Sequence, residues 1–222
     1  MKTFLLTFTA SLITLFFIGC RAEQKQEFLP QQDCPSCSVL PARVQAECVM
    51  TIFEDDGSKF LTNQTHLICL CDKSISIKTT KADGDAIFML DANGDFSYSG
   101  ASLPKNSPLN IFDEQIAELI IQMLTAAKTD YAIVNSDPIN IYGQWYYQIA
   151  DQKNGYIFYK NLSNDRLDLI ISKDYFAKGY DYRNSSALSA AFPATIEISN
   201  IGKNNSPGTK VLKIEYTDII VP

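Results

Sequence analysis

Short runs in which apolar and polar residues alternate recur from residue 44 to residue 218. Because successive side chains of a strand point to opposite faces, this alternation predicts strands with one buried and one hydrated face. Segments rich in glycine, asparagine and aspartate separate the runs and predict turns. The expected strands cover residues 44–53, 66–71, 74–80, 86–90, 95–99, 139–149, 155–159, 166–171, 192–198 and 209–218. About ten or eleven strands of this kind predict a mainly β (α+β) protein with one large antiparallel sheet.

One helix is predicted among the strands, over residues 112–127, where apolar residues recur at steps of three and four. Asn110 is the expected N-cap, and Asp113 and Glu114 place negative charge in the first turn. The apolar stripe packs on the sheet or lines a cavity for a hydrophobic ligand. The candidate cavity residues are Phe112, Ile116, Leu119, Ile120 and Met123.

The first hairpin joins residues 44–53 to the strand that ends near Cys71, through a turn at residues 54–58. A second tight turn is predicted at Asn93-Gly94, with the two positive φ angles of a type I′ hairpin. Asp91, Asn93 and Asp95 also resemble the start of a calcium loop, but the position of the glycine favours a hairpin turn.

The N-terminus has the pattern of an export signal. A single lysine precedes an uncharged apolar segment from residue 4 to residue 18, which is shorter than a membrane-spanning helix. The segment ends in Phe17-Ile18-Gly19-Cys20 and resembles the lipobox of a bacterial lipoprotein precursor. The resemblance implies a signal peptide at 1–19, acylation of Cys20 with palmitate-like chains, and a polar tether at 20–41. A plain secretory signal or an uncleaved anchor is the alternative.

Five cysteines remain after Cys20, which is an odd number for an oxidising compartment. Cys34 and Cys37 form a CxxC without the strand and helix of a thioredoxin site, so a local disulfide is one interpretation. In the first hairpin, Cys48 could face Cys69 or Cys71 and form a disulfide. Zinc held by these thiolates is the weaker alternative, because the spacing matches no standard zinc motif. No metal and no cofactor are expected.

The composition narrows the functional classes. The formal charge is −6, with 19 Lys and Arg against 25 Asp and Glu, which argues against nucleic acid as a partner. The chain has 1 histidine, His66, with no nucleophile or acidic pair near it in the sequence. A lone histidine at the start of a strand is most simply a surface or sheet-edge residue, so we do not expect an enzyme.

The order of several short motifs adds a resemblance over residues 42–222. The motifs are Asn93–Tyr98, the helix, Gly143–Tyr146, Phe192–Ile198 and Lys213–Asp218. In this order they resemble the LolA/LolB-type lipoprotein-localisation superfamily. The resemblance implies an unclosed antiparallel β-barrel, with helices filling its open side and acyl chains held in the hydrophobic hollow.

Two hypotheses for the function follow. The first is an envelope lipoprotein, anchored to the membrane by its N-terminal lipid, that binds an acyl chain, a lipid or a lipoprotein and takes part in lipid or lipoprotein transfer. The second is a structural or interaction lipoprotein of the envelope without a ligand cavity. In the enterobacterial sorting system, Arg21 after the acylated cysteine is not the inner-membrane retention signal. That favours a periplasm-facing position at the outer membrane.

Overall fold

The computed structural model describes residues 43–69, 72–80, 85–100, 102–125, 133–141, 143–151, 156–184, 191–203 and 206–220. The predicted signal peptide at 1–19 and the tether at 20–41 lie outside these residues. Within the described part, no helix has both the length and the apolar character needed to cross a membrane.

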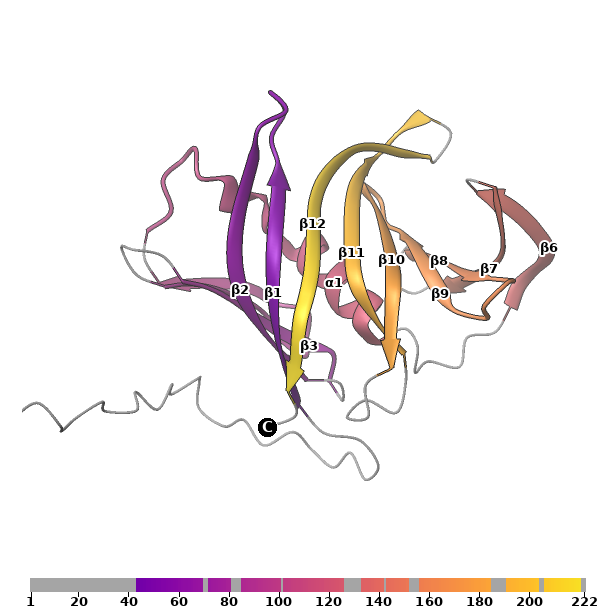
Figure 1. The fold of residues 1–222 in the computed structure, drawn as a ribbon, viewed down its shortest axis with the longest axis horizontal. Coiled ribbons are helices and arrows are strands. Elements are labelled where there is room, and N and C mark those ends of the chain that lie inside the picture. Colours follow the sequence, from indigo (N-terminus) through magenta and orange to yellow (C-terminus); the bar gives the residue numbers. More distant parts are fainter. Residues whose placement is uncertain are drawn as a thin grey trace, which may run out of the picture. The chain divides into compact units, whose positions relative to one another are not determined.

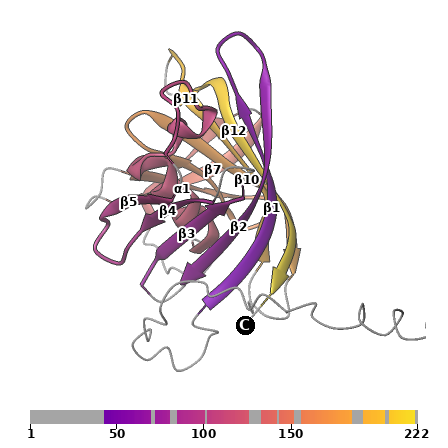
Figure 2. The same cartoon turned by 90° about the vertical axis from the view of Figure 1, so that its left-hand side faces the viewer.

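One antiparallel sheet of 12 strands forms the described domain, in the order β5-β4-β3-β2-β1-β12-β11-β10-β9-β8-β7-β6 (Figure 1). The ends of the sheet, β5 and β6, are not paired with each other, so the predicted unclosed architecture is confirmed. Two views show the sheet curving around α1 (Figures 1 and 2). The strands are β1 Arg43–Phe53, β2 Lys59–Cys69, β3 Ser74–Thr79, β4 Ala86–Leu90, β5 Phe96–Gly100, β6 Ile133–Ile141, β7 Gln144–Asp151, β8 Tyr156–Asn161, β9 Leu167–Ile171, β10 Tyr175–Asn184, β11 Ala191–Ile201 and β12 Pro207–Ile220. The helices are the short 3-10 helix η1 Pro108–Ile111 and α1 Glu114–Thr125.

The described sheet has 12 strands rather than about ten or eleven because two features were not anticipated. The predicted strand 139–149 is the meeting point of β6 and β7, which turn at Gly143 with a φ of +77°. Between the expected strands 166–171 and 192–198, where the sequence predicts no strand, the structure contains β10. Phe176 and Ala177 are both buried although they point to opposite faces, so β10 lacks the alternation that marks a half-buried strand.

The first hairpin turns where the sequence predicts, but its register differs from both disulfide hypotheses. Cys48 lies opposite Gln64, and Cys69 lies opposite Arg43, so the two thiols are several residues out of alignment. Cys48 and Cys69 are both thiols in the structure. A Cys48–Cys69 disulfide is therefore wrong, because β2 begins directly after the tight turn at Glu54–Ser58. Cys71 lies outside the described residues.

The predicted turn at Asn93-Gly94 forms, but it is not type I′. Gly94 has a φ of +87°, whereas Asn93 is not among the described residues with positive φ. The Asp91 carboxylate instead accepts backbone N–H groups of Asn93 and Asp95, at 2.8 and 2.9 Å. This arrangement matches a type I turn followed by a left-handed glycine, another common hairpin geometry.

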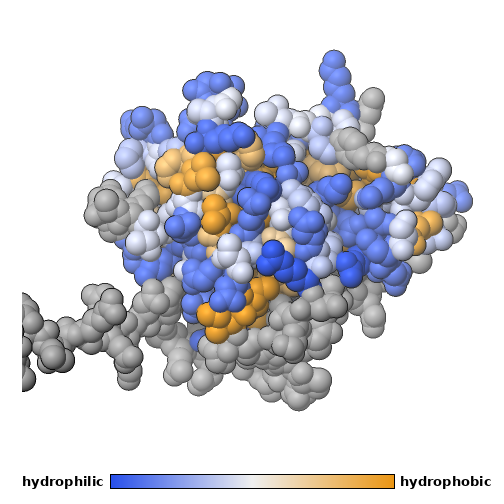
Figure 3. Space-filling model, in the orientation of Figure 1, coloured by the Kyte–Doolittle hydropathy of each residue, from blue (hydrophilic) through white to orange (hydrophobic). Residues whose placement is uncertain are grey.

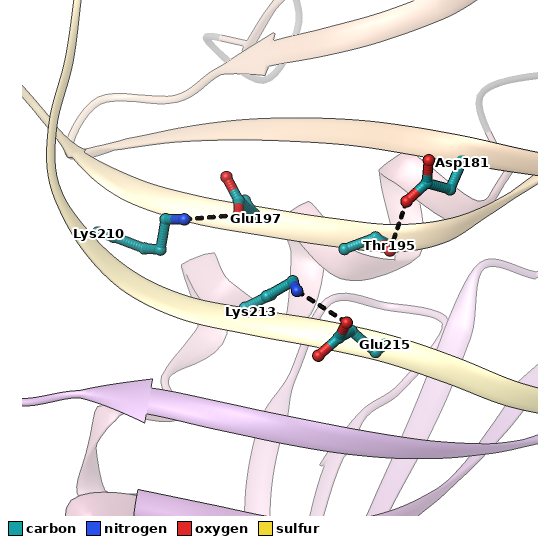
Figure 4. Close-up of polar contacts among 6 residues, drawn as sticks. All are labelled: Asp181, Thr195, Glu197, Lys210, Lys213 and Glu215. Atoms are coloured by element: carbon teal, nitrogen blue, oxygen red, sulfur yellow. Dashed lines mark hydrogen bonds and ion pairs between the residues drawn. The ribbon is translucent and has the colours of Figure 1, made fainter. Parts of the chain in front are cut away.

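The sheet has two chemically different faces. The face towards α1, called the inner face here, is apolar and buried. In β1, β11 and β12 its residues include Val44, Ala46, Met50, Ile52, Phe192, Ile196, Ile198, Leu212 and Ile214. The opposite, outer face carries ion pairs between Lys210 and Glu197, at 2.5 Å, and between Lys213 and Glu215, at 2.7 Å (Figure 4). The space-filling view with β1, β12 and β11 in front is mostly hydrophilic, with small separate hydrophobic areas (Figure 3).

The edge strand β5 ends at a glycine that tolerates no side chain. Gly100 has a φ of +116°, and a Cβ there would lie 2.1 Å from the backbone oxygen of Asp85. Gly57 in the first hairpin is a matched control, because its φ is +83° but a Cβ would meet nothing within 4 Å. We expect Gly57→Ala to lower the free energy of unfolding by about 1 kcal/mol, from backbone strain alone. Gly100→Ala should cost at least about 2 kcal/mol more, measured by urea unfolding, and equal losses would contradict the close approach of β5 to Asp85.

Candidate ligand-binding face

The candidate ligand-binding site consists of the inner face of the sheet and of α1, which packs on that face. The helix begins at an N-cap supplied by Asp113, whose carboxylate accepts the backbone N–H of Ile116 at 2.8 Å. Asn110 was the predicted cap, and that prediction is wrong. Asn110 belongs to η1, where its side chain donates to the backbone oxygens of Pro104 and Lys105.

The structure brings the five predicted cavity residues together at the centre of the hydrophobic core. Phe112 lies just before α1 and packs on Phe88 of β4, with ring centroids 4.7 Å apart. The core cluster that contains these residues also contains inner-face residues from both halves of the sheet. The five, with their exposed fractions, are Phe112 at 5%, Ile116 at 0%, Leu119 at 0%, Ile120 at 0% and Met123 at 2%.

The helix is buried on more than its predicted stripe. Every residue from Leu119 to Thr125 is buried, including Ile121 and the polar Gln122. The helix contacts β3 and β4 on one side of the sheet and β9, β10 and β11 on the other. It therefore fills the curve of the sheet from one half to the other.

Close packing and hydrogen bonds hold α1 against β8, β10 and the turn between β9 and β10. At Gly179 of β10, a Cβ would lie 2.9 Å from the Met123 sulfur, so the helix approaches the strand at a place without a side chain. Gln115 donates to the carboxylate of Asp174 at 2.8 Å. The Glu118 carboxylate accepts the hydroxyl of Tyr156 in β8, and burial together with this carboxylate raises the pKa of Tyr156.

A second feature of the inner face is a buried polar network around His66 in β2. His66 Nδ1 lies 3.0 Å from the hydroxyl of Tyr216, and Nε2 lies 3.0 Å from Gln64 Oε1. The amide nitrogen of Gln64 donates to the Thr79 hydroxyl at 3.0 Å. The Cys48 thiol lies 3.4 Å from His66 Nε2 and 3.7 Å from the backbone oxygen of Gln64. One tautomer satisfies this network, with Nε2–H donating to Gln64 and Nδ1 accepting from Tyr216.

His66 is therefore not the surface or sheet-edge residue that the sequence suggested, because its exposed fraction is 0%. Burial lowers its pKa to about 3 and raises the pKa of the Cys48 thiol. Both groups are consequently neutral at pH 7, whereas nucleophilic catalysis by cysteine needs a thiolate beside a base. The signal that sequence reasoning missed is the alternation of Gln64, His66 and Ile68 on one face of β2.

The remaining predicted site residues are outside the part of the chain that the structure describes. These are Cys20 as the lipid attachment site, and Cys34, Cys37 and Cys71 as disulfide candidates. Among the described residues, no group of three or more His, Cys, Asp or Glu side chains could hold a metal ion.

The fold and the site define a class of protein, an open antiparallel half-barrel whose apolar inner face is covered by a helix. No protein-family model matches the sequence, and no curated protein matches it either. A search of solved structures finds similarity to a LolA superfamily protein from Nitrosomonas europaea, with a TM-score of 0.50 and 13% identity over 82% of this chain and 87% of that chain. A DUF1329 family protein from Desulfovibrio piger also matches, with a TM-score of 0.32 and 10% identity over 82% of this chain and 86% of that one. The fold is therefore LolA-like.

The burial of neutral His66 predicts a specific pH dependence. The folded-state pKa of about 3 is below the ordinary 6.5, so the unfolded chain binds more protons between these values. The stabilisation is complete above pH 6.5 and decreases as the pH falls towards 3, by up to about 1.4 kcal/mol per pH unit. Compared with His66→Gln, which does not titrate, the wild type should lose its stability advantage across this range in chemical unfolding at several pH values. A constant difference between pH 7 and pH 4.5 would contradict the burial of a neutral His66.

Proposed function

We propose that this chain is an envelope lipoprotein that holds acyl chains of a lipid or a lipoprotein on the inner face of its sheet, under α1. The observation that carries the proposal is that α1 covers a largely apolar sheet face and forms one hydrophobic core cluster with it. An acyl chain can cover the same surface in place of the helix. Removing apolar area from water stabilises the contact with the helix and the contact with an acyl chain alike, by about 25 cal/mol per Å². The LolA-like fold supports this proposal, and so does the resemblance of the sequence motifs.

In this proposal, α1 is the element that shifts when the ligand binds. It is a helix of 12 residues laid on a sheet whose strands are hydrogen-bonded to one another, so it can shift without breaking the sheet. Its contacts at Gln115 and Glu118 involve side chains at the margin of the core. A shifted helix would expose Leu119, Ile120 and Met123 to the ligand while β1, β11 and β12 keep their register.

The second hypothesis, a structural or interaction lipoprotein, has one observation in its favour. Met123 fits closely at Gly179, which is how a helix packs in a permanent core. The two functions differ in what the inner face does when α1 is perturbed, so they can be separated by experiment.

Lipid binding and truncation of the helix together test the proposal. Native mass spectrometry of the protein extracted from membranes should find a bound lipid. After delipidation, Leu119→Ala or Met123→Ala should lower the free energy of unfolding by clearly less than the 2–5 kcal/mol of a packed core at one of the two positions. Leu169→Ala in β9, which is 1% exposed and belongs to the separate buried cluster on the other face of the sheet, serves as the packed-core control. Absence of lipid together with core-sized losses at both helix positions would favour the structural lipoprotein.

Anchoring is tested separately. Cys20→Ser should leave an uncleaved precursor without acyl chains, whereas the matched Cys34→Ser should be processed normally, because only the lipobox cysteine is the acyl acceptor. Metabolic labelling with radioactive palmitate and the mass of the mature chain measure both effects. Equal labelling of the wild type and Cys20→Ser would contradict the lipoprotein assignment.

A further inference from the structure

Near the beginning of β9, the buried carboxylate of Asp168 has one oxygen without a hydrogen-bond partner among the described residues. Asp168 is 6% exposed, and its Oδ2 accepts the amide N–H of Asn161 at 2.8 Å. Its Oδ1 is buried and accepts no hydrogen bond from the residues that the structure describes. Burial raises the pKa of this carboxyl, and the side chains of Asn161, Asn164 and Tyr182 together with the charge of Lys178 partly offset that effect. A buried acceptor without a donor is costly, so it marks a place where a donor is expected.

Three of the polar side chains next to Asp168 have other partners. The Tyr146 hydroxyl donates to Gln144 Oε1 at 2.7 Å, and the Asn161 amide nitrogen lies 3.3 Å from the same oxygen. The Tyr182 hydroxyl, which lies close enough to Asp168 for the carboxylate to raise its pKa together with burial, donates to the backbone oxygen of Leu167 at 2.9 Å. A donor from a bound molecule would satisfy Oδ1. We call these residues the Asp168 cluster: Gln144, Tyr146, Asn161, Asp168 and Tyr182.

The Asp168 cluster adjoins the core that α1 covers. A Cβ at Gly179 would lie 2.9 Å from the Tyr182 hydroxyl and 2.9 Å from the Met123 sulfur, so Tyr182 and Met123 meet at the same glycine. Met123 is one of the apolar residues that the proposed acyl chain would contact. A molecule with its chain under α1 could thus place a polar head at Asp168.

A cationic side chain, Arg166, lies next to Tyr182 of the Asp168 cluster. The guanidinium carbon of Arg166 lies 4.9 Å from the centroid of the Tyr182 ring. Arg166 forms no ion pair with a carboxylate in the described part of the chain. Its planar guanidinium group carries several N–H donors and suits an anion such as a phosphate. The surroundings of Tyr182 therefore offer an acceptor, Asp168, and a cation, Arg166.

We infer that the Asp168 cluster is a head-group subsite for a phospholipid whose head carries a primary ammonium, with the ammonium N–H donating to Asp168 and the phosphate at Arg166. The inference rests on the proposed binding of acyl chains under α1. Its chemistry is that of an ethanolamine head, because a quaternary ammonium carries the same charge but has no N–H to donate.

The test is a competition between two lipids that differ only in those N–H groups. The full chain, delipidated, is mixed with equal amounts of lysophosphatidylethanolamine and lysophosphatidylcholine with the same acyl chain, and the bound forms are counted by native mass spectrometry. We expect the ethanolamine lipid to be preferred by at least about tenfold, the factor that one charge-assisted hydrogen bond supplies. Asp168→Asn should reduce the preference to less than about twofold. Asp181→Asn, which changes an exposed carboxylate on the neighbouring β10, should leave it unchanged.

Each other result has a definite meaning. Equal binding of both lipids by the wild type overturns the head-group subsite and leaves the proposed acyl-chain binding intact. Binding of neither lipid contradicts the proposed function and the subsite with it. Arg166→Gln should weaken both lipids by a similar factor of about five, since they share the phosphate, and unchanged binding of both would remove Arg166 from the subsite. The wild-type preference is measured without any variant, so a folding defect in one variant does not affect it.

Discussion

The packing of one helix on one apolar sheet face is the constraint on which the described domain depends. A curved antiparallel sheet can expose its outer face to water, as this one does with Lys210, Glu197, Lys213 and Glu215 (Figure 4). Its inner face must be covered, and the two edge strands do not meet to close a barrel. Helix α1 supplies the cover. Burial of a residue such as Leu119 or Ile120 contributes about 1.5–3 kcal/mol, so this contact is a substantial part of the stability of a domain.

The buried polar groups around His66 and Asp168 differ in whether all their hydrogen-bond partners are present, and this difference bears on function. Every donor and acceptor around His66 has a partner in one tautomer, so the network fixes the pairing of β1, β2 and β12 and needs no ligand. Asp168 keeps an oxygen without a donor although it is almost as deeply buried. A satisfied network is explained by stability, whereas the buried acceptor without a donor is the observation on which the proposed head-group subsite rests.

The sequence was informative where one pattern determines one structure. Alternation predicted most strands, and the three- and four-residue steps of Phe112, Ile116, Leu119, Ile120 and Met123 predicted both α1 and its buried side. The helix was predicted to begin two residues early because an asparagine at 110 and an aspartate at 113 are both good caps, and only the 3-10 turn before α1 decides between them.

Other features depend on contacts between distant segments. The neutral state of His66 arises from its burial in a core that includes Tyr216, 150 positions along the chain, whose hydroxyl lies 3.0 Å from His66 Nδ1. Cys48 could not be paired from the sequence, since a hairpin register depends on the residue at which the turn closes and not on the cysteines. The Asp168 cluster joins side chains from β7, β8, β9 and β10, and no spacing along the chain marks it.

The central claim is that acyl chains lie between α1 and the inner face of the sheet. Photo-crosslinking tests it most directly, with a fatty acid that carries a diazirine near the middle of its chain, added to the delipidated protein and mapped by peptide mass spectrometry. Our account predicts that the labelled side chains belong to α1 and to the inner face, around Leu119, Met123 and Ile196. Labels confined to outer-face residues such as Leu61, or the same labelling after the protein is unfolded, would contradict it.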